Sequence, residues 1–312
     1  MSKISAVLVT YVNRSDDIEK CVDSLLKSIV TMDEIIVVDN ASKLKVSDFL
    51  TKKSNKIKVI RNEVNVGAAA GRNIGIKNSS GDFILFMDDD AIADKNMVKY
   101  LLEVFKKEKK VGFVQPKILD MDNDKVIQGV GHDIDLLTGR VNAWGVNKVD
   151  SGQFDHIHEI PMVGGISMAK REDLDKVGYF DEEYFIPYED SDLSLRFLKK
   201  GFKNYCYGAA KSWHRGKKEV AEYPQLALLG VTTPERAYRV ARNKIIFMRK
   251  HAPTFNLLFF IFILLPMYGI LHTIVIISMK NKEMFMYYWN GMLSGLVYAI
   301  FGRGPNSTYL DN

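Results

Sequence analysis

Four short apolar runs near the start of the chain each end in polar or charged side chains. The runs cover residues 4–9, 35–38, 57–60 and 83–87, and helical patterns separate them. Short runs bounded by polar residues are typical of buried β-strands. Alternating strands and helices indicate right-handed crossovers and a parallel sheet with both faces covered. The sequence therefore predicts an α/β fold with a mostly parallel central sheet.

Polar side chains at the ends of these runs mark the expected ligand site, because ligands of such sheets bind beyond the carboxyl ends of the strands. Thr10 and Tyr11 follow the first run, Asp39 follows the second, and the triplet 88–90 follows the fourth. Arg72 lies in the first turn of the helix predicted after the third run. We expect these side chains to converge on one crevice.

The triplet Asp88, Asp89 and Asp90 is the strongest local signal for chemistry. Three adjacent carboxylates repel one another, and burying them unpaired is costly. A divalent cation removes this conflict, because hard cations take carboxylate oxygens, usually together with substrate phosphates. The alternative is an acidic turn, or the N-cap of a helix predicted at residues 95–105.

Two further positions near the predicted crevice allow two interpretations each. Arg72 lies in a stretch of small residues, 67–75, that matches neither a dinucleotide fingerprint nor a Walker loop. It is a candidate phosphate contact, and the alternative is tight helix packing with a solvated arginine. Asp39 is a candidate acceptor for the ring N–H of uracil or thymine, and the alternative is an Asx turn with residues 40–42.

Glu189, Asp190 and Asp192 form a second acidic cluster, at the start of a predicted helix. Acidic residues in a first turn ordinarily cap the helix, which explains Asp192 better than the two carboxylates that follow aromatic residues. A carboxylate in a partly apolar site can act as a general base toward a hydroxyl. His214 follows a short strand-like run at 205–207. A lone histidine is more often structural than a ligand, unless a carboxylate-bound metal lies nearby.

The order of these motifs resembles that of the inverting family 2 glycosyltransferases, whose fold is the Rossmann-like, type-A nucleotide-sugar-binding fold. The ordered set, over roughly residues 4–216, is more specific than any single motif. The Gln-x-x-Arg-Trp signature of processive polysaccharide synthases is absent, which favours addition of one or a few sugars. Residues 120–159 match no motif. The matching pieces are residues 9–14, 37–42 and 65–73, the aspartate triplet, Gly164-Gly165, residues 189–193 with Arg196, and His214.

The resemblance implies a role for each matched residue. Asp39 would contact the nucleobase of the donor, and Gly164-Gly165 would form a loop near the donor sugar and the acceptor. Asp190 would be the general base of the reaction, assisted by Glu189. Mg²⁺ or Mn²⁺ would lie on the diphosphate of the donor. The candidate residues are Asp190 and Glu189 for catalysis; Thr10, Tyr11, Asp39, Arg72, Asp88, Asp89, Gly164 and Gly165 for donor binding; and Asp88, Asp90 and His214 for the metal.

Composition restricts the class of protein further. The chain has 312 residues, 47% hydrophobic and 26% charged, which is enough to form a full core. A formal charge of +5 is too small to indicate nucleic acid. The two cysteines allow at most one disulfide and have no metal-ligand spacing, which fits a reducing compartment. The apolar run at residues 4–9 is too short for a signal peptide.

The C-terminal quarter is different in character. Residues 255–279 are nearly uninterrupted apolar sequence, about long enough to cross a bilayer core of roughly 30 Å. A shorter apolar stretch at 285–301 either spans or lies in the interface. Six basic residues between 236 and 250 suit an anionic cytoplasmic leaflet. The alternative is a buried helical hairpin of a soluble protein. We expect a catalytic domain at 1–235 and a basic amphipathic helix with a membrane-associated hairpin at 236–312.

Together these features predict a metal-dependent inverting glycosyltransferase at the membrane, with its catalytic domain facing the cytoplasm. It would move a sugar, rhamnose or galactofuranose by preference, from a UDP, dTDP or GDP type of donor to a lipid-linked glycan in surface-glycan assembly. A polyprenyl-phosphate glycosyl synthase is one alternative, and its anionic acceptor would need no base. A nucleotidyltransferase, which releases pyrophosphate, and a catalytically inactive nucleotide-binding membrane scaffold are the others.

Overall fold

The computed structural model describes residues 2–11, 16–215 and 233–302, which divide into two compact units. The second unit contains Ile134–Asn142, Glu183–Tyr188 and the C-terminal helices, and the first contains the remainder. Two short segments from the range predicted for the catalytic domain thus pack with the C-terminal helices. Residues 12–14 and 216 of the predicted motifs lie outside the described residues, as does most of the chain between 216 and the expected boundary at 235.

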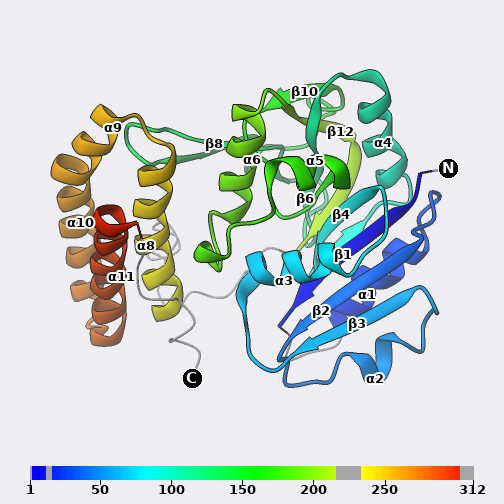
Figure 1. Ribbon diagram of the computed structural model, residues 1–312, viewed down its shortest axis with the longest axis horizontal. Coiled ribbons are helices and arrows are strands. Elements are labelled where there is room, and N and C mark those ends of the chain that lie inside the picture. The colour runs from blue at the N-terminus through cyan, green and yellow to red at the C-terminus, as the bar shows by residue number, and fades with distance from the viewer. Residues whose placement is uncertain (1, 12–15, 216–232, 303–312) are drawn as a thin grey trace. The chain divides into compact units, whose positions relative to one another are not determined.

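A ten-stranded sheet organises the first unit (Figure 1). Its first four strands are parallel, in the order β4-β1-β2-β3, and each begins and ends within two residues of the apolar run that predicted it. Both faces of β1, β2 and β4 are covered, which explains their nearly continuous apolar sequence, whereas β3 is a more exposed edge strand. The predicted α/β fold with a mostly parallel sheet is confirmed. The four strands are β1 (Ile4–Thr10), β2 (Glu34–Asn40), β3 (Ile57–Asn62) and β4 (Phe83–Asp88).

Beyond β4 the sheet becomes mixed. β11 (Ser167–Lys170) lies antiparallel between β4 and β6 (Val111–Asp120), and β12 (Lys203–His214) runs parallel to β6. The far side of β12 pairs with β10 (Ile157–Ile160) and with β5 (Ala91–Ala93). The smaller strands are β7 (Ile127–Gly129) on β6, and a separate pair of β8 (His132–Ile134) and β9 (Val141–Ala143).

The strand expected at residues 205–207 is much longer in the structure, and His214 is its last residue rather than part of a loop after it. The second half of β12 contains glycine, lysine and serine, so it has no apolar pattern that would predict a strand. Backbone pairing with β6 and β5 extends it instead. The pairing of β5 with β12 also means that a strand, and not a helix, follows the aspartate triplet directly.

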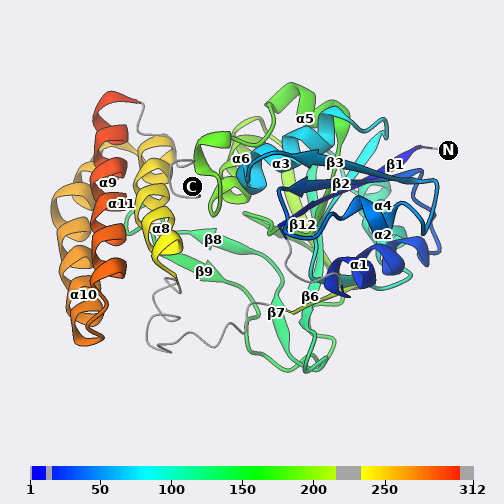
Figure 2. The same ribbon diagram turned by 90° about the horizontal axis from the view of Figure 1, so that it is seen from below.

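Two layers of helices cover the parallel strands, one on each face (Figure 2), and successive side chains of a strand alternate between these layers. On one face, Leu8 and Val37 pack with helices α1 and α4, and on the other, Val7 and Ile36 pack with α3 and α6. The helices predicted between the strands are confirmed. The helices are α1 (Asp16–Leu26), α2 (Ser47–Leu50), α3 (Gly67–Lys77), α4 (Met97–Lys107), α5 (Arg171–Val177), the 3-10 turn η1 (Glu182–Tyr184) and α6 (Glu189–Lys199).

The second unit is helical. Helix α8 (Pro234–His251) begins where the Thr233 side chain accepts a hydrogen bond from the backbone N–H of Arg236, with proline at its first position. Next come α9 (Thr254–Phe259), the π-helical turn η2 (Phe260–Leu264) and α10 (Leu265–Ser278), which together form a helix of 25 residues. Its mean hydropathy of 2.4 makes it long and apolar enough to cross a membrane, the one such helix among the described residues.

Helix α11 (Lys282–Phe301) covers the second predicted apolar segment and packs along α8 in both views (Figures 1 and 2). Glycines at positions 291 and 295 permit the close approach, because a Cβ at 291 would lie 2.3 Å from the carbonyl oxygen of Tyr238. Helix α8 also binds the segment 183–188: Arg242 forms an ion pair with Glu183, and the Asn243 amide donates to the carbonyl of Tyr184 at 2.6 Å.

The packing of α3 on β1 gives a test of this fold. A Cβ at Gly75 would lie 2.3 Å from Cγ1 of Val7, which is buried. Gly75→Ala should lower the free energy of unfolding by about 1–2 kcal/mol, because overpacking outweighs the gain in helix propensity. Denaturant unfolding followed by tryptophan fluorescence measures this. Gly129→Ala is the control, since a Cβ there meets nothing within 4 Å; equal stability of both variants would contradict the packing.

Candidate active site

The parallel strands bring the predicted polar residues to one edge of the sheet. In the register of β1 with its two neighbours, Thr10 lies opposite Asp39, and Val9 lies opposite Asp88. The Thr10 hydroxyl donates to Oδ2 of Asp89 at 2.6 Å. Burial raises the pKa of Asp89 to about 6; the Thr10 hydrogen bond opposes this effect, and the charges of Asp90 and Asp88 add to it. The sheet edge therefore carries the concentrated negative charge that the sequence predicts.

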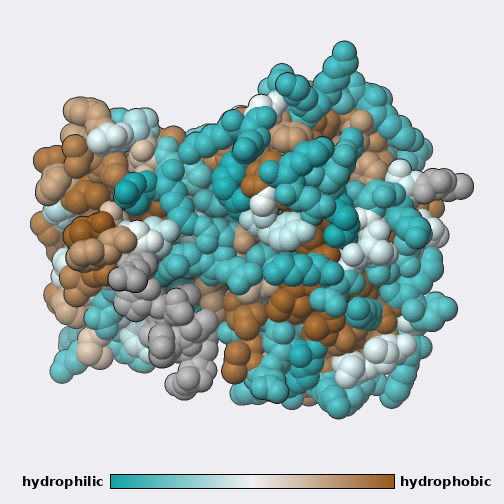
Figure 3. Space-filling view, viewed as in Figure 1, coloured by the Kyte–Doolittle hydropathy of each residue, from teal (hydrophilic) through white to brown (hydrophobic). Residues whose placement is uncertain are grey.

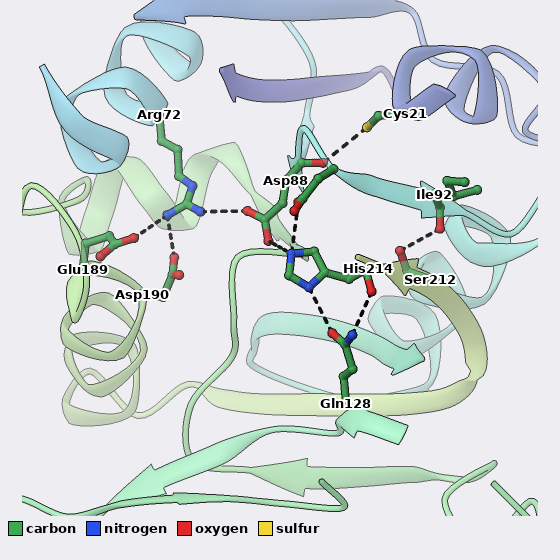
Figure 4. Close-up of polar contacts among 10 residues, drawn as sticks. Cys21, Arg72, Asp88, Ile92, Gln128, Glu189, Asp190, Ser212 and His214 are labelled. Atoms are coloured by element: carbon green, nitrogen blue, oxygen red, sulfur yellow. Dashed lines mark hydrogen bonds and ion pairs between the residues drawn. The ribbon is translucent and has the colours of Figure 1, made fainter. Parts of the chain in front are cut away.

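Arg72 connects the two acidic clusters (Figure 4). Its guanidinium lies 2.9 Å from Oε1 of Glu189, 3.0 Å from Oδ1 of Asp190 and 3.4 Å from Oδ1 of Asp88. The guanidinium is also 5.3 Å from the centre of the Phe180 ring. Because Arg72 is only 6% exposed, these contacts are formed away from bulk water. The predicted phosphate contact stays a prediction.

Burial, together with an excess of carboxylates over the one guanidinium, sets the protonation of the site. Burial raises the pKa of Asp190; Arg72 opposes this effect, and the charges of Glu189 and Asp88 add to it. Burial likewise raises the pKa of Glu189. Within the described part of the chain, Oε2 of Glu189 is buried without a hydrogen-bond partner. The two adjacent carboxyls therefore hold a proton more readily than free side chains do, and they titrate as a pair.

His214 completes the other side of the site. Because β12 pairs with β5, His214 lies opposite Ala91 and its ring reaches the aspartates. Its Nε2 is 3.1 Å from Oδ1 of Asp90 and 3.8 Å from Oδ2 of Asp88. Burial alone would lower the pKa of His214. The hydrogen bond to Asp90 and the charges of the nearby carboxylates together raise it by more, so the net shift of the pKa is upward. The carboxylates thus favour the protonated, positively charged form of this imidazole.

The donor set at this position fits Mg²⁺ or Mn²⁺. Among the described residues, no three side chains of ligand type are already arranged around a common point. The carboxylates of Asp88 and Asp90 nonetheless suit Mg²⁺ or Mn²⁺. Mg²⁺, for example, takes one or two carboxylates and completes its coordination shell with substrate phosphates and water. The imidazole of His214 supplies a third donor within 4 Å of both Asp88 and Asp90. A metal here would depend on the bound diphosphate.

The glycine pair predicted near the donor sugar lies in the loop between β10 and β11. A Cβ at Gly165 would lie 2.5 Å from Oδ1 of Asp88 and 2.9 Å from a terminal nitrogen of Arg72. Only glycine allows that approach without displacing these groups. The backbone N–H of Gly164 donates to Oε1 of Gln115 at 2.8 Å, which fixes the loop on β6.

Asp39 shows the alternative environment that the sequence left open. Its Oδ1 accepts the backbone N–H of Ser42 at 2.8 Å, as in an Asx turn, and its Oδ2 lies 2.5 Å from Arg61. The predicted contact of Asp39 with a nucleobase stays a prediction. The predicted donor contact of Tyr11, whose side chain is exposed, also stays a prediction. Arg61 was not predicted as a site residue, although its position directly after the third apolar run is the same signal that marked Asp39.

Gln128 is the other residue that sequence reasoning missed. It lies on β7, inside the segment 120–159 that matches no motif, and both ends of its amide contact His214. A single glutamine in a strand of three residues has no signal of its own in the sequence. Its importance becomes visible only through the pairing of β6 with β7 and β12.

Comparison with known proteins agrees with this geometry. The dTDP-rhamnosyl transferase RfbF of Shigella flexneri is 27% identical over 298 residues, which are 91% of this chain and 92% of that protein. An uncharacterized glycosyltransferase of Haemophilus influenzae is 29% identical over 196 residues, 59% of this chain and 64% of that protein. Glycosyltransferase GlyG of Streptococcus pneumoniae is 31% identical over 106 residues, 33% of this chain. The chain covers less than two thirds of the length of the last two proteins.

Solved structures share the fold. Residues 1–349 of S. aureus TarS superpose with a TM-score of 0.58 and 20% identity, over 96% of this chain and 81% of that one. GalNAc-T7, solved with UDP, GalNAc and Mn²⁺, gives a TM-score of 0.60 and 18% identity over 77% of this chain and 48% of that one. At this identity the likeness establishes the type-A fold alone.

The family model for glycosyl transferase family 2 matches residues 5–178. The match includes the aspartate triplet, Arg72 and the glycine pair, and it ends before Asp190 and His214. Since the matched residues are more than half of the chain, this chain belongs to glycosyl transferase family 2.

Proposed function

We propose that this protein transfers a glycosyl residue from a nucleoside diphosphate sugar to a hydroxyl group of a glycan acceptor, with inversion at the anomeric carbon. The observation that carries this proposal is the contact of one buried guanidinium with carboxylates of both acidic clusters. It keeps a candidate base, Asp190, beside the carboxylate edge where the diphosphate would bind. Carboxylates whose pKa is raised by burial and neighbouring charge are concentrated at catalytic sites, which favours an enzyme over a binding protein.

Asp190 is the proposed base, with Glu189 beside it. Its deprotonated carboxylate takes the proton of the acceptor hydroxyl, and the oxygen then attacks the anomeric carbon from the face opposite the leaving group. The bond between sugar and diphosphate breaks, and its electron pair leaves with the nucleoside diphosphate. Arg72 orients the two carboxyls through its bonds of 2.9 and 3.0 Å.

Asp88, Asp90 and His214 are proposed to hold a divalent cation, which when bound neutralises charge on the departing diphosphate. Thr10 keeps Asp89 turned toward the sheet edge through its hydroxyl. Gly165 leaves room for the donor sugar next to Asp88 and Arg72. Asp39 and Tyr11 are proposed to contact the nucleobase of the donor. The contact with Asp39 requires Arg61 to move away from it.

The donor is proposed to be a dTDP or UDP sugar, with rhamnose preferred. This choice is supported by the relative named as a dTDP-rhamnosyl transferase, whose match extends over 91% of this chain. TarS, which shares the fold, was solved with UDP-GlcNAc. A panel of nucleotide sugars, with release of nucleoside diphosphate as the signal, decides among them. Release of pyrophosphate would instead identify a nucleotidyltransferase, and no turnover with any donor would favour a scaffold.

The acceptor is proposed to be lipid-linked, and the protein to bind the cytoplasmic face of a membrane. Exposed apolar side chains gather over α9, α10 and α11 (Figure 3). Two spans would draw α8 toward the bilayer along with α11, and each Lys or Arg at the bilayer centre costs about 2.5–3.5 kcal/mol. Since α8 is basic along its length and packs on α11, we favour a hairpin that lies in the interface.

The base assignment predicts the effect of one substitution. Asp190→Asn should reduce kcat by about 10²–10⁴-fold, because general-base assistance is worth that much, while the affinity for UDP or dTDP stays within a few-fold. Transfer rates and calorimetric nucleotide binding measure the two quantities. Asp48→Asn is the matched control, an exposed carboxylate in the first turn of α2. A normal kcat in Asp190→Asn would remove the base and favour a phosphate acceptor.

The pH dependence of transfer activity is a second test of Asp190 as the general base. The base acts only when deprotonated, and burial raises its pKa. Activity of the unchanged protein should therefore fall, as pH is lowered, at a pH above the ordinary aspartate value of about 3.9. Asp190→Asn should lack that part of the profile.

The metal assignment predicts dependence on a divalent ion. EDTA should abolish transfer, and Mn²⁺ or Mg²⁺ should restore it, because Asp88 and Asp90 would otherwise face the diphosphate with like charge. Asp90→Ala should lose donor binding as well as turnover, measured by calorimetry with and without Mn²⁺, whereas Asp48→Ala should keep both. Full activity in chelator would return the triplet to a structural role.

The membrane assignment predicts how the protein partitions. It should stay with membranes through washes with high salt and carbonate. Ile270→Glu combined with Ile274→Glu should weaken vesicle binding at least tenfold, because both side chains are 60% exposed and each buried isoleucine is worth about 1.5–3 kcal/mol. Val64→Glu, at a residue 58% exposed in the first unit, is the control.

Labelling of Asn281→Cys from outside intact cells distinguishes the two membrane arrangements. A hairpin in the interface leaves this cysteine unlabelled, whereas two spans expose it. Full-length protein in the soluble fraction would contradict both arrangements.

A further inference from the structure

We propose that Gln128 is a positioning residue that fixes the ring orientation and tautomer of His214, so that Nε2 is held toward the carboxylates of Asp88 and Asp90. This inference rests on the proposed metal role of His214 and adds a residue from the segment that matches no motif. Gln128 reaches His214 from β7 and lies on the side of the ring away from the aspartates (Figure 4).

The orientation of the Gln128 amide follows from its partners. Its Nε2 donates to the backbone carbonyl of His214 at 2.8 Å and lies 3.3 Å from Oδ2 of Asp120. Both partners are acceptors, so the reversed amide would place an oxygen against two oxygens. The amide oxygen must therefore be the atom that faces Nδ1 of His214, at 3.0 Å.

The tautomer of His214 follows in turn. An amide oxygen only accepts, so Nδ1 must carry the proton and donate it. In the neutral ring the second nitrogen, Nε2, then has a lone pair, and this lone pair is directed at Oδ1 of Asp90, 3.1 Å away. Without a metal, a proton on this lone pair makes the hydrogen bond to Asp90, and a divalent cation would take the place of that proton. Gln128 thus prepares Nε2 as a ligand in the way that outer partners orient metal-bound histidines.

A neutral amide suits this place better than the carboxylates that often hold a metal-ligating histidine. The site already contains the aspartate triplet, and Asp120 lies beside the Gln128 amide. A carboxylate at position 128 would accept the proton of Nδ1 equally well, but it would face Asp120 and add one more negative charge. Gln128 orients the ring without that repulsion.

The test measures Mn²⁺ binding directly, by electron paramagnetic resonance of free Mn²⁺ in the presence of UDP or dTDP. In full-length protein, Gln128→Leu should weaken Mn²⁺ binding about 10–100-fold, as loss of such outer partners does. Gln128→Glu should recover only part of this affinity, because one carboxylate oxygen still accepts from Nδ1 while the other faces the carbonyl of His214 and Asp120. Gln153→Leu is the matched control: this exposed glutamine in the same segment bonds the backbone of Val149 and should bind Mn²⁺ normally.

His214→Ala separates failure of this inference from failure of the proposed function. Unchanged Mn²⁺ affinity in His214→Ala would remove His214 from the proposed metal site and the inference with it. If His214→Ala weakens binding but Gln128→Leu stays within twofold of the unchanged protein, the inference alone is overturned. Weakened binding in Gln128→Leu with the Nδ1–H tautomer of His214 unchanged would assign the residue to packing and also overturn it. Ring ¹⁵N shifts of His214 should report the Nδ1–H tautomer in the unchanged protein and its loss in Gln128→Leu.

Discussion

The buried guanidinium of Arg72 is the interaction on which the site depends. Its three carboxylate partners come from β4 and from the start of α6, more than 100 residues later in the chain. Burying such carboxylates without a cation would cost several kcal/mol for each charge. Their burial is therefore possible only while α3, β4 and α6 stay packed together. The next residue, Asn73, strengthens this arrangement through two hydrogen bonds with the backbone of Phe180, whose ring lies against the guanidinium.

Asp88 joins the two halves of the site. One of its oxygens faces Arg72 at 3.4 Å and the other faces His214 at 3.8 Å. A positive charge brought to the His214 side would draw Asp88 toward it and weaken its hold on the guanidinium. Arg72 would then be left with Glu189 and Asp190 alone, and its field would favour their ionised form. Binding of the proposed metal with a diphosphate and deprotonation of the proposed base would thus be coupled through a single carboxylate.

The sequence predicts the parallel half of the fold closely, because strands buried on both faces have nearly continuous apolar runs. It also predicts which residues share the sheet edge, since parallel strands end together. It does not reveal β5, β7 or the second half of β12, because strands of three residues have no periodicity and β12 is extended by pairing alone. Gln128 and the contact of His214 with Asp90 depend on these pairings. The sequence also does not predict which carboxylates pair with Arg72. An arginine in the first turn of a helix is as consistent with a phosphate contact as with a buried ion pair.

The basic helix before the apolar segments shows a different limit of sequence reasoning. Composition treats all six of its cations alike, as residues suited to an anionic membrane surface. Arg242 is fully buried, however, and forms its ion pair with Glu183, while Asn243 donates to two carbonyls of the same segment. Helix α8 thus holds the segment 183–188 within the second unit. The same helix packs on α11, so it connects this segment with the apolar helices of its own unit.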